Sequence, residues 1–225
     1  MRIARDSLVD ALVARLRADV LSDRYPPGAL LPPERELAAA YGVTRTSLKH
    51  ALVRLAQAGL VETRHGVGTR VCDYARDGGP DLLPMLVAHA GPDWLGEIFE
   101  ARREIGALVA ARAATHAAGP DRARLRELLA EVRAAPDADA AQLAECEAHR
   151  VLAAACGNRV YALLVNSLLS AYLAVREGFV EPFRDPGAAA ERLAPLVEAV
   201  CAGEPAGAYA AATEYLSRTE RLMLG

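Results

Sequence analysis

The chain has 225 residues, of which 52% are hydrophobic, so it is long enough for one large domain or two modest ones with a substantial core. Its four cysteines show no paired spacing, and it has neither a signal peptide nor an apolar run long enough to cross a bilayer, so we expect a protein of the reducing cytoplasm. Residues 1–73 hold 11 basic and 8 acidic side chains, a charge of +3, whereas residues 74–225 hold 15 and 21, a charge of −6, which places a candidate polyanion-binding region at the N-terminal end.

The first periodic segment predicts an amphipathic helix. Leu8, Leu12, Leu16 and Val20 recur every four residues, as the apolar stripe of a core-facing helix does. Ser7 precedes this stripe and is the expected N-cap. A Pro-Pro-Gly turn then ends the unit.

Two further helices and a hairpin are expected next. A short helix should begin with Pro33 as its first residue and stop at Gly42, and Thr44 can cap a third helix over about residues 45–58. After Gly59 the pattern alternates between apolar and polar residues, which predicts two short strands joined by a glycine-containing turn. Helix, short turn, helix and hairpin is the order of a winged helix-turn-helix.

Polar and basic side chains gather at the start of the third helix, where the free amides of the helix N-terminus also attract phosphate. These residues are Arg45, Thr46, Ser47 and Lys49. His65 and Gly66 mark the tip of the hairpin, where a glycine lets the backbone approach DNA closely. Each of these groups alone is an ordinary solvated surface group, but their joint placement favours DNA binding.

Residues 26–71, which read PPGALLPPERELAAAYGVTRTSLKHALVRLAQAGLVETRHGVGTRV, resemble the DNA-binding domain of the GntR family of bacterial regulators. The resemblance implies DNA contacts by Arg35, Thr44, Arg45, Thr46, Ser47, Lys49, His65 and Gly66. This chain has Lys49 and His50 where the family usually has Arg and Glu. Because lysine cannot make the planar two-pronged contact to guanine, we carry no operator sequence over from relatives.

The remainder of the chain predicts an all-helical domain. Asp, Gly and Pro are frequent from residue 73 to 84, so we divide the chain into a DNA-binding domain (1–73), a linker (74–84) and a helical domain (85–225). A short leading helix and six longer ones are expected, the latter over residues 92–117, 121–134, 138–156, 158–178, 187–203 and 206–223. The expected fold class is therefore mainly α, with a winged helix-turn-helix, a small β-hairpin wing and an all-α C-terminal bundle.

Two segments of the helical domain, DWLGEIFEARREIGALVAARAAT and ECEAHRVLAAACGN, resemble the ligand-binding domain of the FadR branch of the family. Many members of that branch bind a metal ion through an Asp and a His four residues apart and two later histidines. Here Glu145 and His149 form the first pair, but Leu193 and Tyr215 stand at the other two positions. We therefore expect no cofactor and no bound metal, and His149 is then an interior polar residue with satisfied hydrogen bonds.

Several stretches are more similar to the fatty-acid regulators of the branch than to its metal-binding members, which favours an acyl-CoA or a fatty acid as effector. Arg102 is expected either to pair with a carboxylate or phosphate of the effector or to form a surface ion pair with Glu97 or Glu100 on its own helix. Tyr172 and Tyr215 are candidates for the same pocket, or else ordinary core tyrosines. Glu145 and His149 complete the five candidate effector-binding residues.

The sequence thus predicts a homodimeric, effector-gated regulator that binds palindromic operator DNA. A metal-assisted regulator that responds to organic acids and a constitutive DNA binder without effector are the alternatives within the same fold. An enzyme with Glu145 and His149 as an acid/base pair is a further alternative, although the sequence has neither a glycine-rich phosphate loop nor a nucleophile elbow. We therefore expect the protein not to be an enzyme.

Overall fold

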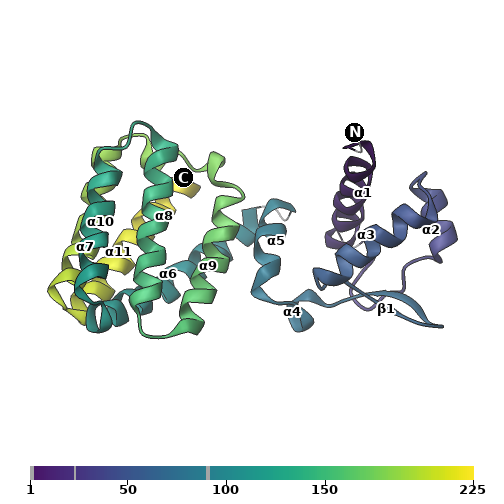
Figure 1. Ribbon diagram of the computed structural model, residues 1–225, viewed down its shortest axis with the longest axis horizontal. Helices are drawn as coiled ribbons and strands as arrows, with labels where there is room; N and C mark the ends of the chain where they lie inside the picture. The colour runs from purple at the N-terminus through teal and green to yellow at the C-terminus, as the bar shows by residue number, and fades with distance from the viewer. Residues whose placement is uncertain (1–2, 23, 90–91) are drawn as a thin grey trace. The chain divides into compact units, whose positions relative to one another are not determined.

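The computed structural model describes residues 3–22, 24–89 and 92–225 (Figure 1). The chain divides into two compact units, Met1–Leu82 and Leu83–Gly225, and the division falls inside the segment that the sequence predicts to be a linker. That segment contains a short helix and one turn of 3-10 helix, α4 (Tyr74–Asp77) and Pro80–Leu82. Both units are mainly helical, as predicted.

The N-terminal unit has the order of a winged helix-turn-helix. Its elements are α1 (Ile3–Leu21), α2 (Glu34–Ala40), α3 (Arg45–Gln57), β1 (Val61–Arg64) and β2 (Gly68–Val71). Gly42 and Gly59 follow α2 and α3 in the left-handed conformation, with φ of 64° and 74°, which confirms them as the residues that end these helices. Two N-terminal caps differ from the prediction. Ser7 lies inside α1, and Pro33 is the N-cap of α2 instead of its first residue.

The core of this unit forms where α1 packs against α3. Leu16 of α1 and Leu48 of α3 are completely buried, and Leu12 and Val20 of the predicted stripe are buried with them. Leu8 breaks the stripe, because its side chain is 48% exposed. Leu8 lies at the edge of the contact between α1 and α3, where Asp10 and Arg54 form an ion pair at the surface with side chains 57% and 49% exposed.

The wing contains a third extended segment that the sequence did not reveal. β1 and β2 pair antiparallel, with Val61 opposite Val71, and Leu30 forms an isolated antiparallel bridge with Arg70 on the other edge. Two backbone hydrogen bonds of 2.8 Å hold this edge: Leu31 N–H donates to the Thr69 carbonyl, and Val71 N–H to the Ala29 carbonyl. The chain that leads into α2 is therefore fixed to the wing.

The C-terminal unit is a helical bundle, and its described residues contain no strand. Its helices are α5 (Leu83–His89), α6 (Pro92–His116), α7 (Gly119–Arg133), α8 (Ala138–Ala155), α9 (Arg159–Leu173), α10 (Pro186–Ala202) and α11 (Pro205–Leu224). The helix predicted over 158–178 is shorter than expected, and 3-10 turns Arg176–Gly178 and Glu181–Phe183 follow it. The buried Gln142 amide donates to the carbonyls of Arg176 and Phe179, which holds this segment outside the helix.

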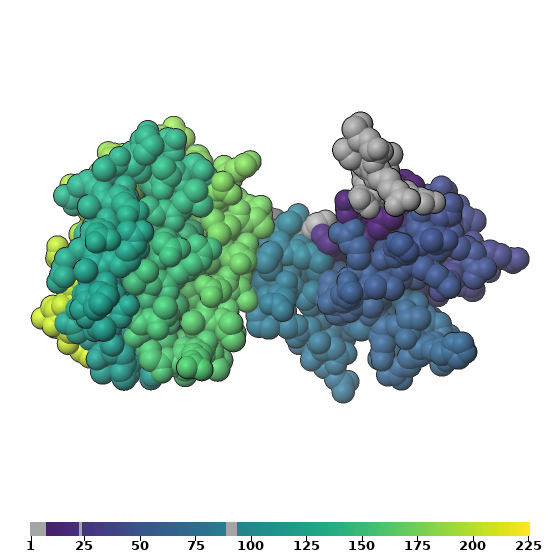
Figure 2. Space-filling model, in the orientation of Figure 1, coloured from purple at the N-terminus to yellow at the C-terminus, as the bar shows by residue number. Residues whose placement is uncertain are grey.

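The helices of the bundle pack as antiparallel neighbours around a main core (Figure 1), and a smaller cluster of Val87, Ile98, Leu168 and Ala171 lies where α5, α6 and α9 meet. The closest pairs are α6 with α11, α7 with α8 and with α10, and α5 with α9. Gly106 shows how close the first pair is, because a Cβ added there would lie 2.6 Å from Leu216 Cδ1. Side chains close over α8 and α9 on the face seen in Figure 2, so the interior of the bundle is covered there. Among the described helices, none is both long and apolar enough to cross a membrane.

Candidate DNA-binding face and effector pocket

The start of α3 is built by a capping interaction that leaves its cations exposed. Thr44 has an extended backbone and is the N-cap, and its Oγ1 accepts a hydrogen bond of 3.1 Å from the Ser47 backbone N–H. The two hydroxyl groups also lie 3.0 Å apart. Arg45, Thr46 and Lys49 are exposed beside this cap, whereas Leu48, Leu52 and Leu55 of the same helix are buried.

A carboxylate that the sequence did not single out lies beside these cations. Glu34 Oε2 is 3.7 Å from Arg45 Nη2 and 4.0 Å from Lys49 Nζ. Glu34 is the first residue of α2, and neither pair has a helical spacing, so only the fold brings the three side chains together. The sequence signal that could have predicted this contact is the helix-turn-helix order itself, once the positions of α2 and α3 in that motif are taken into account.

The other predicted DNA-contacting residues lie on α2 and on the wing. Arg35 is exposed on the first turn of α2, and His65 and Gly66 are exposed in the turn between β1 and β2. Gly66 has a φ of 76°, a conformation that a residue with a side chain rarely adopts. A hollow of about 700 Å³ separates the start of α2 from this turn.

In the C-terminal unit, four of the five predicted effector residues meet at one buried carboxylate, that of Glu145. Glu145 Oε1 accepts hydrogen bonds from Arg102 Nη2 at 2.8 Å and from Tyr215 Oη at 2.8 Å, and it lies 2.7 Å from His149 Nε2. Arg102 comes from α6, Glu145 and His149 from α8, and Tyr215 from α11. The alternative prediction, a surface ion pair of Arg102 with Glu97 or Glu100, is therefore wrong. The guanidinium pairs with Glu145 on the neighbouring helix α8.

The electrostatics of this cluster favour its charged form. Burial alone raises the pKa of Glu145, but the charges of His149 and Arg102 and the hydrogen bonds from His149 and Tyr215 lower it to about 2. Burial lowers the pKa of Arg102, but the Glu145 carboxylate and the other neighbouring groups together raise it above its ordinary value. Burial and the same carboxylate raise the pKa of Tyr215 well above its ordinary value, so its hydroxyl remains a donor. The centre of the site is therefore an ion pair of Glu145 with Arg102, and His149 and Tyr215 donate further hydrogen bonds to the carboxylate.

Tyr172, the fifth predicted effector residue, joins the cluster through its ring. The Arg102 guanidinium lies 5.3 Å from the centre of the Tyr172 ring, which is within the range of a cation–π contact. The ring of Phe179 stacks on Tyr172 at 6.3 Å, and its carbonyl is held by Gln142. The Tyr172 hydroxyl is buried, and no hydrogen-bond partner lies within reach among the described residues.

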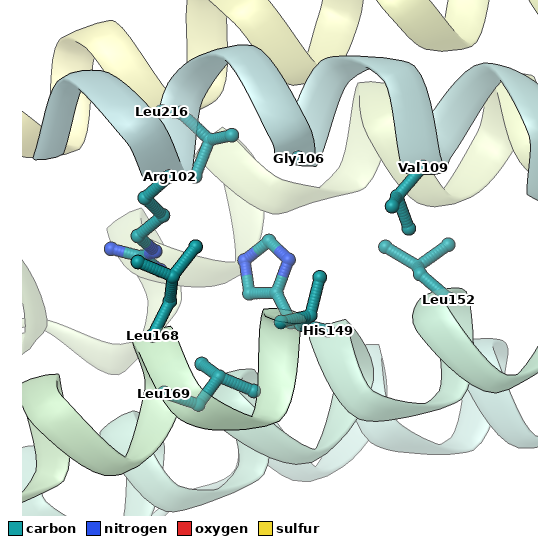
Figure 3. Close-up of a pocket in the computed structure, with 9 residues that line it drawn as sticks. Arg102, Gly106, Val109, His149, Leu152, Leu168, Leu169 and Leu216 are labelled. Atoms are coloured by element: carbon teal, nitrogen blue, oxygen red, sulfur yellow. The ribbon is translucent and has the colours of Figure 1, made fainter. Parts of the chain in front are cut away.

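Arg102 and His149 face a small cavity lined mainly by leucine and valine side chains (Figure 3). Arg102, Gly106 and Val109 lie on one wall, on α6, and His149 and Leu152 of α8 lie opposite them. The remaining lining residues are Val165, Leu168, Leu169 and Leu216. The cavity measures about 20 Å³, which is room for one water molecule. Its lining combines mainly apolar side chains with two polar groups, as the lining of a ligand pocket does.

The residues present do not fit a four-ligand metal site. Glu145 and His149 are adjacent, but Leu193 is an apolar core residue and Tyr215 uses its hydroxyl as a donor to Glu145. Glu145 Oε1, the oxygen beside His149 Nε2, already accepts a hydrogen bond from the Arg102 guanidinium. Within residues 3–22, 24–89 and 92–225, no three His, Cys, Asp or Glu side chains are grouped so that they could hold a metal ion.

Comparisons with known proteins assign both units. Residues 8–71 match the model of the gntR family of bacterial regulatory proteins, and residues 97–218 match the FCD domain. An uncharacterized HTH-type transcriptional regulator of Mycobacterium tuberculosis is 36% identical over 217 residues, which cover 96% of this chain and 90% of that protein. The Fatty acid metabolism regulator protein of Edwardsiella ictaluri is 35% identical over 161 residues, 69% of this chain and 65% of that protein.

A solved structure shows the same fold. Streptococcus agalactiae GntR superposes with a TM-score of 0.53 at 24% identity, covering 95% of this chain and 99% of that one. The GntR family consists of transcription regulators, not enzymes, and the FCD domain is its FadR-type C-terminal domain. The chain is therefore a member of the GntR family, a DNA-binding transcription regulator with an N-terminal winged helix-turn-helix and a helical FCD domain.

Proposed function

We propose that this regulator binds palindromic operator DNA as a cytoplasmic homodimer and that an acyl-CoA or a fatty acid controls its affinity for that DNA. Arg45 and Lys49 on α3, Arg35 on α2 and the wing tip at His65 are the proposed DNA contacts. This proposal is supported by the exposure of all four side chains on the helix-turn-helix and the wing. A dimer fits a palindrome because two-fold protein symmetry matches two-fold operator symmetry.

The observation that carries the effector proposal is the buried guanidinium at the wall of an apolar cavity. Arg102 is 8% exposed and faces leucine and valine side chains, so a ligand there would combine an apolar chain with an acid group. The similarity to proteins named Fatty acid metabolism regulator protein supports the same class of ligand, although it covers only part of each chain.

The size of the cavity makes the proposed binding a conformational event. A cavity of about 20 Å³ cannot hold an acyl chain, so the side chains of α9 and α11 that line it must move apart. A ligand that binds only the expanded bundle shifts the population of conformations toward it. That shift is the proposed means by which the ligand changes operator affinity.

Thermal melting of the full chain tests the effector. Oleoyl-CoA, free oleate, small organic acids and divalent cations are added separately, and we expect only the acyl compounds to raise the melting temperature. The Arg102→Lys variant should lose most of this rise, whereas Arg103→Lys, the same change one position away in an ion pair with Glu220, should keep it. A rise with a metal ion plus an organic acid would favour the metal-assisted sensor. No rise with any ligand would favour a constitutive DNA binder.

A further inference from the structure

Glu34 occupies an unusual place for an acidic residue in a DNA-binding face. Its carboxylate oxygen Oε2 is shared by Arg45 and Lys49, the two cations that lie one helical turn apart on the exposed side of α3. The side chains of the two cations are 65% and 60% exposed, and among the residues that the structure describes neither forms another ion pair. Glu34 thus competes with DNA phosphates for the same two charges.

The ion pairs of Glu34 are too weak for its main role to be structural. Exposed pairs at such distances contribute roughly 0–1 kcal/mol to stability, and salt screens them. The fold of the N-terminal unit instead rests on buried residues such as Leu16, Leu48 and Leu55. The consequence of Glu34 should therefore be sought in DNA binding.

Non-specific and specific complexes respond differently to such a competitor. Binding to arbitrary DNA depends almost entirely on cation–phosphate attraction, so a carboxylate that withholds two cations weakens it in full. In an operator complex, directed hydrogen bonds to bases and fixed phosphates also contribute, and a carboxylate beside the cations orients them for those bonds. An element that penalises the wrong partner more than the right one raises specificity.

We infer that Glu34 is a specificity-determining residue, which lowers affinity for DNA of arbitrary sequence more than affinity for the operator. The inference rests on the proposed DNA contacts of Arg45 and Lys49. Its effect is on the ratio of two affinities, not on either affinity alone. A merely structural residue would leave that ratio unchanged.

The test compares Glu34→Gln with the wild-type chain. A duplex selected by the wild-type protein from a random library serves as operator, and a scrambled duplex of the same composition serves as arbitrary DNA. Dissociation constants are measured for both at two salt concentrations. We expect Glu34→Gln to bind the scrambled duplex at least about threefold more tightly, with a smaller gain for the operator and a steeper salt dependence for the scrambled duplex.

Glu36→Gln is the matched control, because Glu36 is exposed in the same first turn of α2 and forms no ion pair with any residue that the structure describes. It removes the same charge and should leave the ratio of affinities near the wild-type value. Equal gains for both duplexes in Glu34→Gln, or the same loss of specificity in Glu36→Gln, would overturn the inference. A wild-type chain without any preference among duplexes would instead defeat the proposed function itself, and the inference with it.

Discussion

The Arg102 guanidinium and the Glu145 carboxylate form a buried ion pair, with Nη2 and Oε1 2.8 Å apart and side chains only 8% and 1% exposed. Removing two opposite charges from water costs several kcal/mol per ion, which is offset only where hydrogen bonds satisfy both groups. Tyr215 and His149 complete the set around the same oxygen. The pair therefore joins α6 to α8 beside the cavity, and the Tyr215 hydrogen bond joins α11 to the same carboxylate.

Removing one member of this pair should destabilise the C-terminal unit strongly. Arg102→Met leaves Glu145 buried without its counter-charge, and we expect the free energy of unfolding to fall by about 3–5 kcal/mol. The double variant Arg102→Met/Glu145→Leu removes both charges and should recover part of this loss. Chemical denaturation followed by circular dichroism measures the unfolding free energies of the double variant and of the two single variants, Arg102→Met and Glu145→Leu. A double variant that loses as much as the two single variants together would show that the charges do not interact.

Stability should depend on pH through Glu145. Its pKa in the folded chain is about 2, below the ordinary value of 4.5, so the unfolded chain binds a proton more readily. The resulting stabilisation is fully present above about pH 4.5 and is lost as the pH falls toward about 2. Unfolding free energies measured across this window should fall more steeply for the wild-type chain than for Glu145→Gln. Parallel curves would contradict the lowered pKa.

Truncation should cost far more stability at one position of α3 than at another. Leu48 is completely buried and Val53 is 56% exposed on the same helix. Leu48→Ala leaves a cavity in the core of the N-terminal unit and should cost about 2–5 kcal/mol of unfolding free energy, whereas Val53→Ala should cost less than about 0.5. Similar values for the two variants in urea denaturation would be inconsistent with the packing of α1 on α3.

The cap of α3 should contribute measurably to the stability of the N-terminal unit. Thr44→Ala removes the acceptor for the Ser47 backbone N–H and should lower the unfolding free energy by about 1 kcal/mol. Thr44→Ser keeps a hydroxyl at the same place and should retain most of that stability. The comparison fails if the serine variant is as unstable as the alanine variant in the same denaturation experiment.

Local patterns were sufficient to predict most of the fold. The helical period of Leu12, Leu16 and Val20, the cap at Thr44 and the glycines after α2 and α3 each act within a few residues, and the structure confirms them. Non-local contacts were not predictable in this way. The bridge between Leu30 and Arg70 joins segments far apart in the sequence, so no short-range spacing encodes it.

In the candidate sites, too, the sequence predicted individual residues but not their contacts across the fold. Resemblance to the family singled out the pair Glu145 and His149, and placed Arg102 and Tyr215 at the effector pocket. Only the packing of three helices shows that all four meet at one oxygen. The partner of Arg102 was assigned to its own helix as an alternative, because sequence spacing reveals neighbours at three and four residues but not across a bundle. Glu34 was missed for the same reason.

Sequence-specific DNA binding by the start of α3 is tested most directly by the affinity of Arg45→Ala for the duplex that the wild-type chain selects. Arg133→Ala is the control, because it removes the same charge from an exposed site on α7 of the other unit. We predict that Arg45→Ala weakens binding by at least about tenfold, the effect of one lost direct contact, while Arg133→Ala binds as the wild type does. Equal affinities for the two variants would contradict the assignment of this face to the operator.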